Sequence, residues 1–542
     1  MSGLEKILKK IDRKTIPEKI AEEKISKESV TKEDIKRIVL STTLTTNAVV
    51  QSQNHPETGL IVISGPGIDP EAFRQGEHYY AVSGSIDHRG REVEPINISQ
   101  IKKIITLLKK DGVKYVGVIG KFSPRNPAHE INIANMLENS FEKVFMGHTI
   151  SGNLNFPRRI ATTRLNAIVY KLHKLFFEAV QKSLAAKGLS IPIHILKADG
   201  GTMNLASSMD FPGQSVLSGP AASAMGSIAF APEKQDVVVI DIGGTTTDIS
   251  ILIDKTPVLE PVGIKHGGYK TLIRSLQNKS IGIGGDSYVK VVKGELIIGP
   301  ERKGPAMAFG GKHPTTTDAL SVLNIMDQGN RENAILGIQP IADTLNVSII
   351  EASEMIFNQA CNSIIHEIFT IIKKMNSKPV YTVHEFLDSY KITPMKILIM
   401  GGPAPYFAEM LQDISGIETV VLPNWGTANA TGAALARTTC EVSLIADTEL
   451  GFITSPEEDY KEKITGIYSE EDALETAYSL LLHKTLINGS SSDNFQAEVI
   501  ESQTFDIVKD SAQMGKNIRI KIQAKPGLIH GYKSYIQEPD KK

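Results

Sequence analysis

One segment, residues 237–252, constrains the fold of this chain more than any other. It reads V-V-V-I-D-I-G-G-T-T-T-D-I-S-I-L, two apolar runs joined through Gly243 and Gly244. The β-branched first run is typical of a strand buried on both faces of a sheet. The two glycines permit positive φ and let the backbone approach a ligand without a Cβ in the way. The segment therefore predicts a strand–turn–strand hairpin whose turn faces a bound group.

The residue types in and beside this turn point to phosphate and a divalent metal. Backbone N–H groups and three consecutive threonine hydroxyls can donate to phosphate oxygens, and each such bond to a charged group contributes roughly 1.5–3 kcal/mol. Asp241 and Asp248 flank the turn, and carboxylates suit Mg²⁺, usually through water. We therefore predict Asp241 and Asp248 as metal ligands and catalytic residues; a plain Gly-Gly hairpin is the structural alternative. The predicted nucleotide-binding residues of the turn are Gly243, Gly244, Thr245, Thr246 and Thr247.

Two further segments fit the same kind of site. Residues 217–226 predict a helix that begins with Ser218, Gly219 and a proline, and its small side chains would let the helix N-terminus approach an anion. A tightly packed, N-capped helix is the alternative. Residues 397–407 predict a strand, a turn at Gly401 and Gly402, and a helix start. Structural turn and nucleotide contact are equally supported there.

The length of 542 residues predicts two or three domains rather than one core. Strand-like runs alternate with helical ones, which favours a mainly parallel α/β layer. The last hundred residues are more polar and predict a small α+β appendage with strands near 497–500 and 517–523. Other predicted elements are helices at 98–110 and 162–186, strands at 59–64, 113–119 and 192–196, and two short helices in 1–38. The expected domains are 1–235, 236–440 and 441–542.

Composition excludes several classes of partner. The formal net charge is −2, which gives no electrostatic case for nucleic acid or an anionic membrane. No apolar run reaches the roughly 18 residues that a membrane span needs, and the N-terminus has no uninterrupted apolar core of a secretory signal. Cys361 and Cys440 are far apart and lack metal-ligand spacing, so Cys361 is expected in the core. The chain is expected to be cytoplasmic.

A series of short motifs resembles the hydantoinase/oxoprolinase family, A-type subunit. Each motif is weak alone, but they follow the order of the family over most of the chain. They include F-S and N-P-A-H-E within 122–130, A-D-G-G at 198–201, S-G-P-A at 218–221 and the hairpin D-I-G-G-T-T-T-D at 241–248. The others lie at residues 282–287, 304–311, 315–318, 401–402, 432–434 and 515–527.

The resemblance implies an α/β fold with an actin-like (ribonuclease H-like) ATPase core of two α/β domains and the small C-terminal appendage. It implies ATP and Mg²⁺ as cofactors, with Gly401 and Gly402 on the adenosine side. The implied activity is an ATP-dependent hydrolase that phosphorylates the carbonyl oxygen of a cyclic amide, of hydantoin or 5-oxoproline type, so that water opens the ring. Related members carboxylate ketones, and many work with a B-type subunit.

The chain also departs from the family pattern. Residues 1–40 contain no counterpart of the N-terminal Asp-x-Gly-Gly-Thr phosphate loop. Such a sequence encoded upstream or adjacent would show that a longer start or a separate chain supplies it. The family's His-Gly-Thr-Thr landmark reads L-S-T-T here, with Leu40 and Ser41 in place of histidine and glycine. These departures keep open a non-hydrolysing, nucleotide-binding regulatory or assembly protein. A sugar-kinase-like phosphotransferase is disfavoured because no separate acid is placed as the base for a hydroxyl.

Six polar residues are candidates for contact with the substrate. Three belong to predicted loops where the chain diverges from the family, and a surface-turn role is the alternative for each. The other three belong to the motif segments. The candidates are Asp87, His88, His148, Asp199, Asp286 and Asp318.

Overall fold

The structure is a computed structural model that describes residues 35–41, 57–260, 263–377, 391–509 and 512–535. The two short helices predicted in the first 38 residues fall mostly outside these ranges. Within the described ranges, no helix combines the length and apolarity needed to cross a membrane. Both cysteines are free and buried, and Cys361 lies in the core as predicted.

The N-terminal sheet is a parallel four-stranded sheet of order β3-β2-β6-β7, which confirms the predicted parallel α/β layer. Its strands are β2 (Thr58–Ile63), β3 (Tyr79–Ala81), β6 (Tyr115–Gly120) and β7 (Lys143–Met146). Helix α4 (Ile98–Lys110) has the predicted bounds and packs Ile101, Ile104 and Leu108 on one face of the sheet. Helix α5 (Ala128–Leu137) covers the same face. A short β4–β5 hairpin (Ser85–Ile86 and Glu92–Glu94) precedes α4.

Helix α7 (Phe156–Ala186) packs on the opposite face of the N-terminal sheet and reaches the next sheet. It begins six residues before the predicted start because the Asn155 side chain caps it by accepting from the N–H of Arg158, with a proline in the first turn. The second sheet has the order β1-β8-β9, formed by β1 (Ile38–Leu40), β8 (Ile193–Leu196) and β9 (Thr202–Asn204). Phe177 of α7 packs there on Ile195 and Met203.

The central sheet contains the hairpin predicted from residues 237–252. Its order is β12-β11-β10-β18-β19, with β10 antiparallel to β11 and parallel to β18. A hairpin followed by parallel strands is the arrangement of a ribonuclease H-like core. The strands are β10 (Asp236–Ile242), β11 (Thr247–Ile253), β12 (Thr256–Pro257), β18 (Lys396–Met400) and β19 (Glu418–Val421). In addition, β15 (Asn278–Ile281) pairs with β11.

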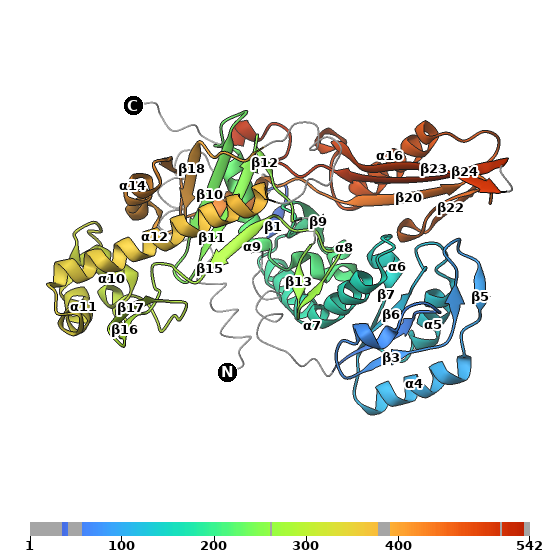
Figure 1. The fold of residues 1–542 in the computed structure, drawn as a ribbon, viewed down its shortest axis with the longest axis horizontal. Helices are drawn as coiled ribbons and strands as arrows, with labels where there is room; N and C mark the ends of the chain where they lie inside the picture. Colours follow the sequence, from blue (N-terminus) through green and yellow to red (C-terminus); the bar gives the residue numbers. More distant parts are fainter. Residues whose placement is uncertain (1–34, 42–56, 261–262, 378–390, 510–511, 536–542) are drawn as a thin grey trace.

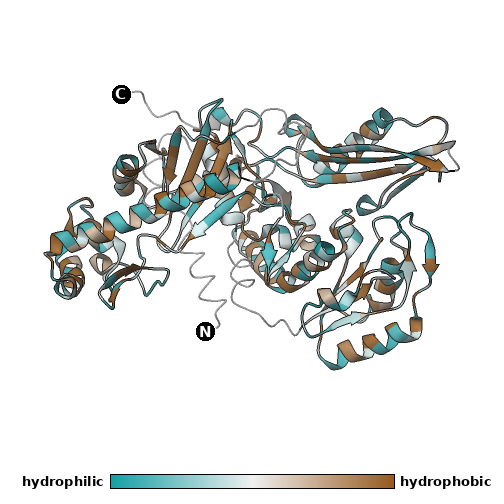
Figure 2. Ribbon diagram, in the orientation of Figure 1, coloured by the Kyte–Doolittle hydropathy of each residue, from teal (hydrophilic) through white to brown (hydrophobic). Residues whose placement is uncertain are grey.

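Helices cover both faces of the central sheet, as the apolar run of β10 predicts. Val238 and Ile240 face α12 (Ile349–Asn376) and α14 (Ala404–Ser415). Val237 and Val239 face α9 (Ser218–Ile228) and α15 (Ala428–Leu435). Figure 2 shows the hydrophobic residues gathered along these strands. A smaller cluster at the outer end of α12 holds α10 (Thr316–Val322), α11 (Arg331–Leu345) and the hairpin of β16 (Val289–Val292) and β17 (Glu295–Ile298).

The C-terminal sheet is antiparallel, has the order β22-β21-β20-β24-β23, and carries α16 (Glu470–Ile487) on one face. This is the predicted α+β appendage. Its strands are β20 (Glu441–Asp447), β21 (Phe452–Ser455), β22 (Tyr460–Lys463), β23 (Ala497–Lys509) and β24 (Ala512–Ala524). In Figure 1 this sheet extends beside the N-terminal sheet, away from the central sheet.

Candidate functional site

The turn between β10 and β11 exposes a set of unused hydrogen-bond donors. It is closed by the N–H of Gly243, which donates to the carbonyl of Thr246 at 2.9 Å. Within the part of the chain that the structure describes, the N–H groups of residues 244–246 and the hydroxyls of Thr245 and Thr246 make no hydrogen bond. Consecutive free N–H groups in a glycine turn form a concavity that suits an anion.

Asp241 and Asp248 are direct partners in the register of β10 and β11, immediately beside this turn. Ser223 of α9 donates its hydroxyl to Oδ2 of Asp241 at 2.5 Å, and Asn278 of β15 lies 3.4 Å from Oδ1 of Asp248. Burial raises the pKa of both carboxyls, and the charge of Asp241 raises the pKa of Asp248 further. Two carboxylates held face to face favour a cation between them.

This donor set fits Mg²⁺. Mg²⁺ is held in proteins by one or two carboxylates, with water and substrate phosphates as its other ligands. Among the described residues, no group of three or more His, Cys, Asp or Glu side chains could hold a metal by itself. The residues present therefore suit a cation that arrives with phosphate rather than an all-protein metal cage.

The loop of residues 282–287 braces the turn from one side. The N–H of Gly285 donates to the carbonyl of Gly243 at 3.0 Å, and the N–H of Asp286 donates to the carbonyl of Gly244 at 2.6 Å. A Cβ on Gly284 would lie 2.6 Å from the carbonyl oxygen of Gly243, so only glycine allows this approach. The carboxylate of Asp286 therefore lies beside the turn, where it pairs with Arg302 at 2.6 Å.

The side chain of Thr247, predicted to contact the nucleotide, is engaged by the bracing loop. Its hydroxyl donates to the carbonyl of Ile283 at 2.7 Å, and the residue is fully buried. Strand β11 begins at Thr247, so its side chain points onto the bracing loop instead of into the turn. Of the three threonines, only Thr245 and Thr246 keep a hydroxyl for a ligand.

Gly401 and helix α9 both contact Asp241 from other elements. Gly401 has φ +97°, and a Cβ there would lie 2.6 Å from Oδ1 of Asp241, whereas Gly402 has open space around it. Ser218 begins α9 and lies with its hydroxyl 3.1 Å from that of Ser41. The same helix carries Ser223 to Asp241. Sequence reasoning missed Ser223 because a serine inside an alanine-rich helix gives no signal of its own.

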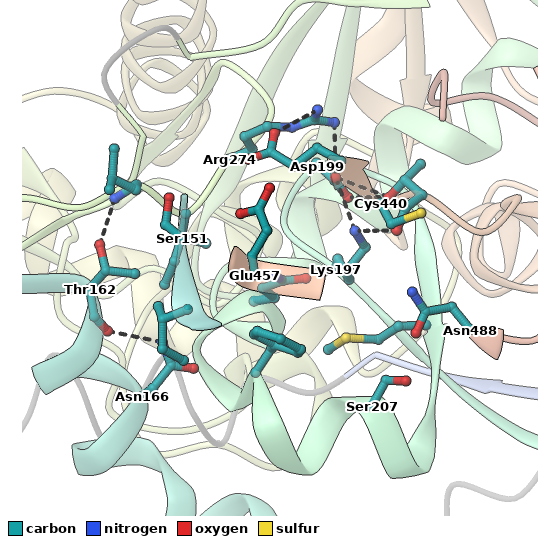
Figure 3. A pocket seen from close by; sticks show the side chains of 18 of the residues that line it. Ser151, Thr162, Asn166, Lys197, Asp199, Ser207, Arg274, Cys440, Glu457 and Asn488 are labelled. Atoms are coloured by element: carbon teal, nitrogen blue, oxygen red, sulfur yellow. Dashed lines mark hydrogen bonds and ion pairs between the residues drawn. The ribbon is translucent and has the colours of Figure 1, made fainter. Parts of the chain in front are cut away.

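Asp199 lies in a narrow pocket of about 80 Å³ between the β8–β9 connection and the C-terminal sheet. Lys197 Nζ is 3.2 Å and Arg274 Nη2 is 3.1 Å from its carboxylate (Figure 3). Although burial opposes ionisation, Lys197, Arg274 and the hydrogen bonds of Gly201 and Thr439 together lower the pKa of Asp199 to about 2. The pocket is lined by ion pairs that join two parts of the chain.

Two other substrate candidates, Asp318 and His148, hold local structure. Asp318 accepts from the N–H groups of Met307, Ala308 and Thr315 at the start of α10. His148 is buried, with Nδ1 2.6 Å from Glu130. Because these side chains already have hydrogen-bond partners within the protein, the structure does not support the substrate contacts predicted for them.

Asp87 also has a local role, because its carboxylate accepts from the N–H groups of Arg89 and Arg91 in the β4–β5 turn. His88 is exposed on that turn and lines a separate cavity. Asp286 is thus the one substrate candidate that directly borders the hairpin turn.

A hairpin with free turn donors, opposed aspartates and a ribonuclease H-like sheet defines an α/β protein with a candidate phosphate site. Comparison with known families agrees: residues 159–442 match hydantoinase/oxoprolinase, and residues 3–141 match the hydantoinase/oxoprolinase N-terminal region. The chain therefore belongs to the hydantoinase/oxoprolinase family, which confirms the resemblance inferred from its motifs.

Relatives of known sequence fall in the same group. An uncharacterized protein of Methanocaldococcus jannaschii is 24% identical over 80% of this chain and 69% of its own length. The acetophenone carboxylase gamma subunit of Aromatoleum aromaticum is 26% identical over 50% of this chain and 40% of its own. The caprolactamase subunit alpha of Pseudomonas jessenii is 25% identical over 50% of this chain and 42% of its own length. The match thus spans less than half of the last two relatives.

Two solved structures show the fold. Nucleotide-free acetone carboxylase, from work on ATP-dependent acetone carboxylation, has a TM-score of 0.67 at 16% identity and covers 93% of this chain and 80% of its own. The ATP-dependent caprolactamase of Pseudomonas jessenii has a TM-score of 0.65 at 17% identity, and the match covers 94% of this chain and 82% of that chain. The predicted fold class is confirmed.

Proposed function

We propose that this chain is the nucleotide-binding subunit of an enzyme that uses ATP to activate the carbonyl oxygen of a cyclic amide for hydrolysis. One observation carries the proposal: Asp241 faces Asp248 beside a Gly-Gly-Thr-Thr turn. Among the described residues, the N–H groups of residues 244–246 and the hydroxyls of Thr245 and Thr246 have no hydrogen-bond partner. Membership of the hydantoinase/oxoprolinase family supports the substrate class. The ATP dependence named for acetone carboxylation and for caprolactamase supports the cofactor.

Each group near the turn has a distinct task in this proposal. The free N–H groups and the hydroxyls of Thr245 and Thr246 hold phosphate oxygens. Asp241 and Asp248 hold Mg²⁺, which when bound offsets negative charge on the transferring phosphoryl group. Ser223 orients Asp241, and Gly401 allows the nucleotide-side loop to lie against it.

The chemistry explains why ATP is needed. Resonance makes an amide carbonyl a poor electrophile, and transfer of the terminal phosphoryl group of ATP to its oxygen creates a leaving group. Water then adds to the carbon and the C–N bond breaks, with the ring nitrogen taking up a proton, which leaves an acyl phosphate. A second water hydrolyses this acyl phosphate and releases phosphate. The products are ADP, phosphate and the ring-opened amino acid.

We propose that a partner chain completes this enzyme, either a B-type subunit or a chain with the further phosphate loop. Two relatives carry names that identify them as subunits, which supports this arrangement. Partner requirement can be read directly from activity with and without the B-type protein.

The test is phosphate release by the full chain with Mg²⁺-ATP and a panel of hydantoin, 5-oxoproline and caprolactam, with and without a B-type subunit. We expect substrate-stimulated release, and a loss of about 100-fold in Asp241→Asn, the scale seen when one transition-state stabiliser is removed. Asp343→Asn, an exposed aspartate on α11, is the matched control. ATP binding in calorimetry without stimulated turnover would instead identify a regulatory or assembly protein.

A further inference from the structure

A second cavity, of about 400 Å³, lies between the C-terminal sheet and the β4–β5 turn of the N-terminal part. Its volume falls in the range of about 300–1,000 Å³ that is typical of small-molecule sites. None of the residues that line it belongs to the β10–β11 hairpin or to the loops around that turn. It is therefore a different site from the candidate nucleotide site.

The floor of this cavity is the face of the C-terminal sheet that points away from α16. Side chains alternate along a strand, so Ile518 and Ile520 of β24 pack on α16 while Asn517 and Arg519 point to the opposite face. Arg519 is opposite Ile445 of β20, and Asn517 is opposite Phe505 of β23. The floor thus combines one guanidinium with apolar and aromatic side chains.

The wall of the cavity, formed by the β4–β5 turn and the segment between β6 and α5, is held against this floor by ion pairs and hydrogen bonds. Arg89 of the β4–β5 turn pairs with Glu449 at 2.7 Å and with Asp447 at 3.6 Å, so its charge is already balanced. Asn126 donates its side-chain N–H to the carbonyl of Gly90 at 2.9 Å. These contacts position the neighbouring Arg125, which comes from the segment between β6 and α5.

Within the described chain, neither Arg125 nor Arg519 forms an ion pair. The Arg125 side chain makes no hydrogen bond or ion pair within the described chain, and its Nε is buried without a partner. Arg519 donates to the side chain of Asn517 at 3.1 Å and lies 5.3 Å from the ring of Phe505, but it pairs with no acid among the described residues. Burial, and then the charge of Arg519, lower the pKa of Arg125 to about 10, although the charge of Asp447 acts in the opposite direction.

The acids at this cavity do not supply the missing charge. Asp447 is engaged by Arg89 and by the N–H of Leu450. Asp506 is exposed at the rim and has an interaction of its own. Two guanidinium groups that line one cavity without an ion-paired acid of their own are costly to hold there, and a bound carboxylate or phosphate relieves that cost.

We propose that this cavity binds a small organic anion, whose carboxylate or phosphate group is held by Arg125 and Arg519 and whose apolar body packs on Ile445, Phe452 and Phe505. The site is independent of the proposed ATP chemistry. Since Arg125 and Arg519 come from different parts of the chain, the bound anion joins the N-terminal part to the C-terminal sheet.

Calorimetry on the full chain tests the proposal with benzoate, phenyl phosphate, inorganic phosphate and neutral benzamide as probes. We expect benzoate or phenyl phosphate to bind at least about 10-fold more tightly than benzamide, and more weakly as salt rises. The better of the two anions identifies the head group. Phenyl phosphate should bind more tightly than inorganic phosphate, because the aromatic side chains of the cavity contact its phenyl ring.

Variants separate this site from general charge effects. Arg125→Met and Arg519→Gln should each lower the affinity about 10-fold or more, whereas Lys102→Met, which removes an exposed charge from α4, should not. Asp241→Asn should bind the anion as the native chain does. Without ligand, the thermal midpoint of Arg125→Met should be equal to or above that of the native chain, because the Arg125 side chain makes no hydrogen bond or ion pair with the described residues. The increase in midpoint that the anion produces in the native chain should be lost in this variant.

Several results would overturn the proposal. They are the absence of binding by either organic anion, equal affinity for benzamide, and unchanged affinity in both arginine variants.

Discussion

The pair Asp241 and Asp248 is the most informative feature at the residue scale. Each is partly buried, each has a raised pKa, and they are opposed across two strands. A turn with a purely structural role needs no such pair, because burial and mutual repulsion disfavour the ionised form of two neighbouring acids. The proposed cation would offset the charge of this pair.

The raised pKa of these two groups predicts a definite pH dependence. Unfolded aspartate ionises near 3.8, whereas the folded carboxyls keep their protons to higher pH. The folded state therefore binds more protons in that window, and their contribution to the free energy of unfolding falls as pH rises through it. Mg²⁺-ATP needs the ionised form, so its stabilising effect should grow with pH.

Thermal melts with and without Mg²⁺-ATP from about pH 5 to about pH 7 measure this effect. The ligand-induced rise in melting temperature should increase with pH in the native chain and stay small in Asp241→Asn. An equal rise in both proteins would show that Asp241 does not hold the metal.

At the scale of elements, the close crossing of α9 and α15 positions one side of the site. A Cβ on Gly432 of α15 would lie 2.2 Å from the backbone nitrogen of Gly226 and 2.3 Å from the carbonyl oxygen of Ala222. Backbone atoms cannot yield as a side chain can, so glycine at 432 sets the distance between the helices. Helix α9 then carries Ser223 to Asp241.

We expect Gly432→Ala to separate these helices. Overpacking of this kind costs about 1–3 kcal/mol, and ATP affinity should fall with it because Ser223 moves from Asp241. Gly426→Ala, at a glycine with open space around it, is the control and should leave both unchanged. Urea denaturation and calorimetry with ATP measure the two effects; an unaltered ATP affinity would show that α9 does not position the site.

At the scale of the whole molecule, a buried ion-pair network joins parts that are distant in the chain. Asp199 follows β8, and Arg274 reaches both Asp199 and Glu441 of the C-terminal sheet. Lys197 donates to the carbonyl of Thr439 at 2.8 Å. This network fixes the C-terminal sheet against the rest of the molecule.

Asp199→Asn should destabilise the whole chain, because it leaves buried cations without their acid. Removing one partner of a buried pair costs about 3–5 kcal/mol. The folded pKa is about 2 and the unfolded one near 3.8, so Asp199 stabilises the fold above 3.8 and loses that effect as pH falls toward 2. The difference in urea stability between native and variant chains should therefore shrink in acid.

Asp343→Asn serves as the control for this measurement, since Asp343 is exposed on α11 and should change stability little at any pH. A difference between native and Asp199→Asn chains that stays constant down to the pH of unfolding would contradict the assigned role.

The sequence by itself determined the features that depend on local pattern. The run before Asp241 alternates between two packed faces, the glycine turn follows directly, and α4 has the predicted bounds because its apolar spacing is regular. The ordered motifs determined the family. These features are local, so neighbouring residues suffice to encode them.

Only the tertiary structure decided which polar side chains have free atoms. Thr247, His148 and Asp318 looked as available as Thr245 in the sequence, yet their partners come from other elements. Ser223 contacts Asp241, and Arg125 and Arg519 line one cavity, through the packing of distant segments. Hydrogen bonding and desolvation depend on what surrounds an atom in space, and sequence spacing does not specify those surroundings.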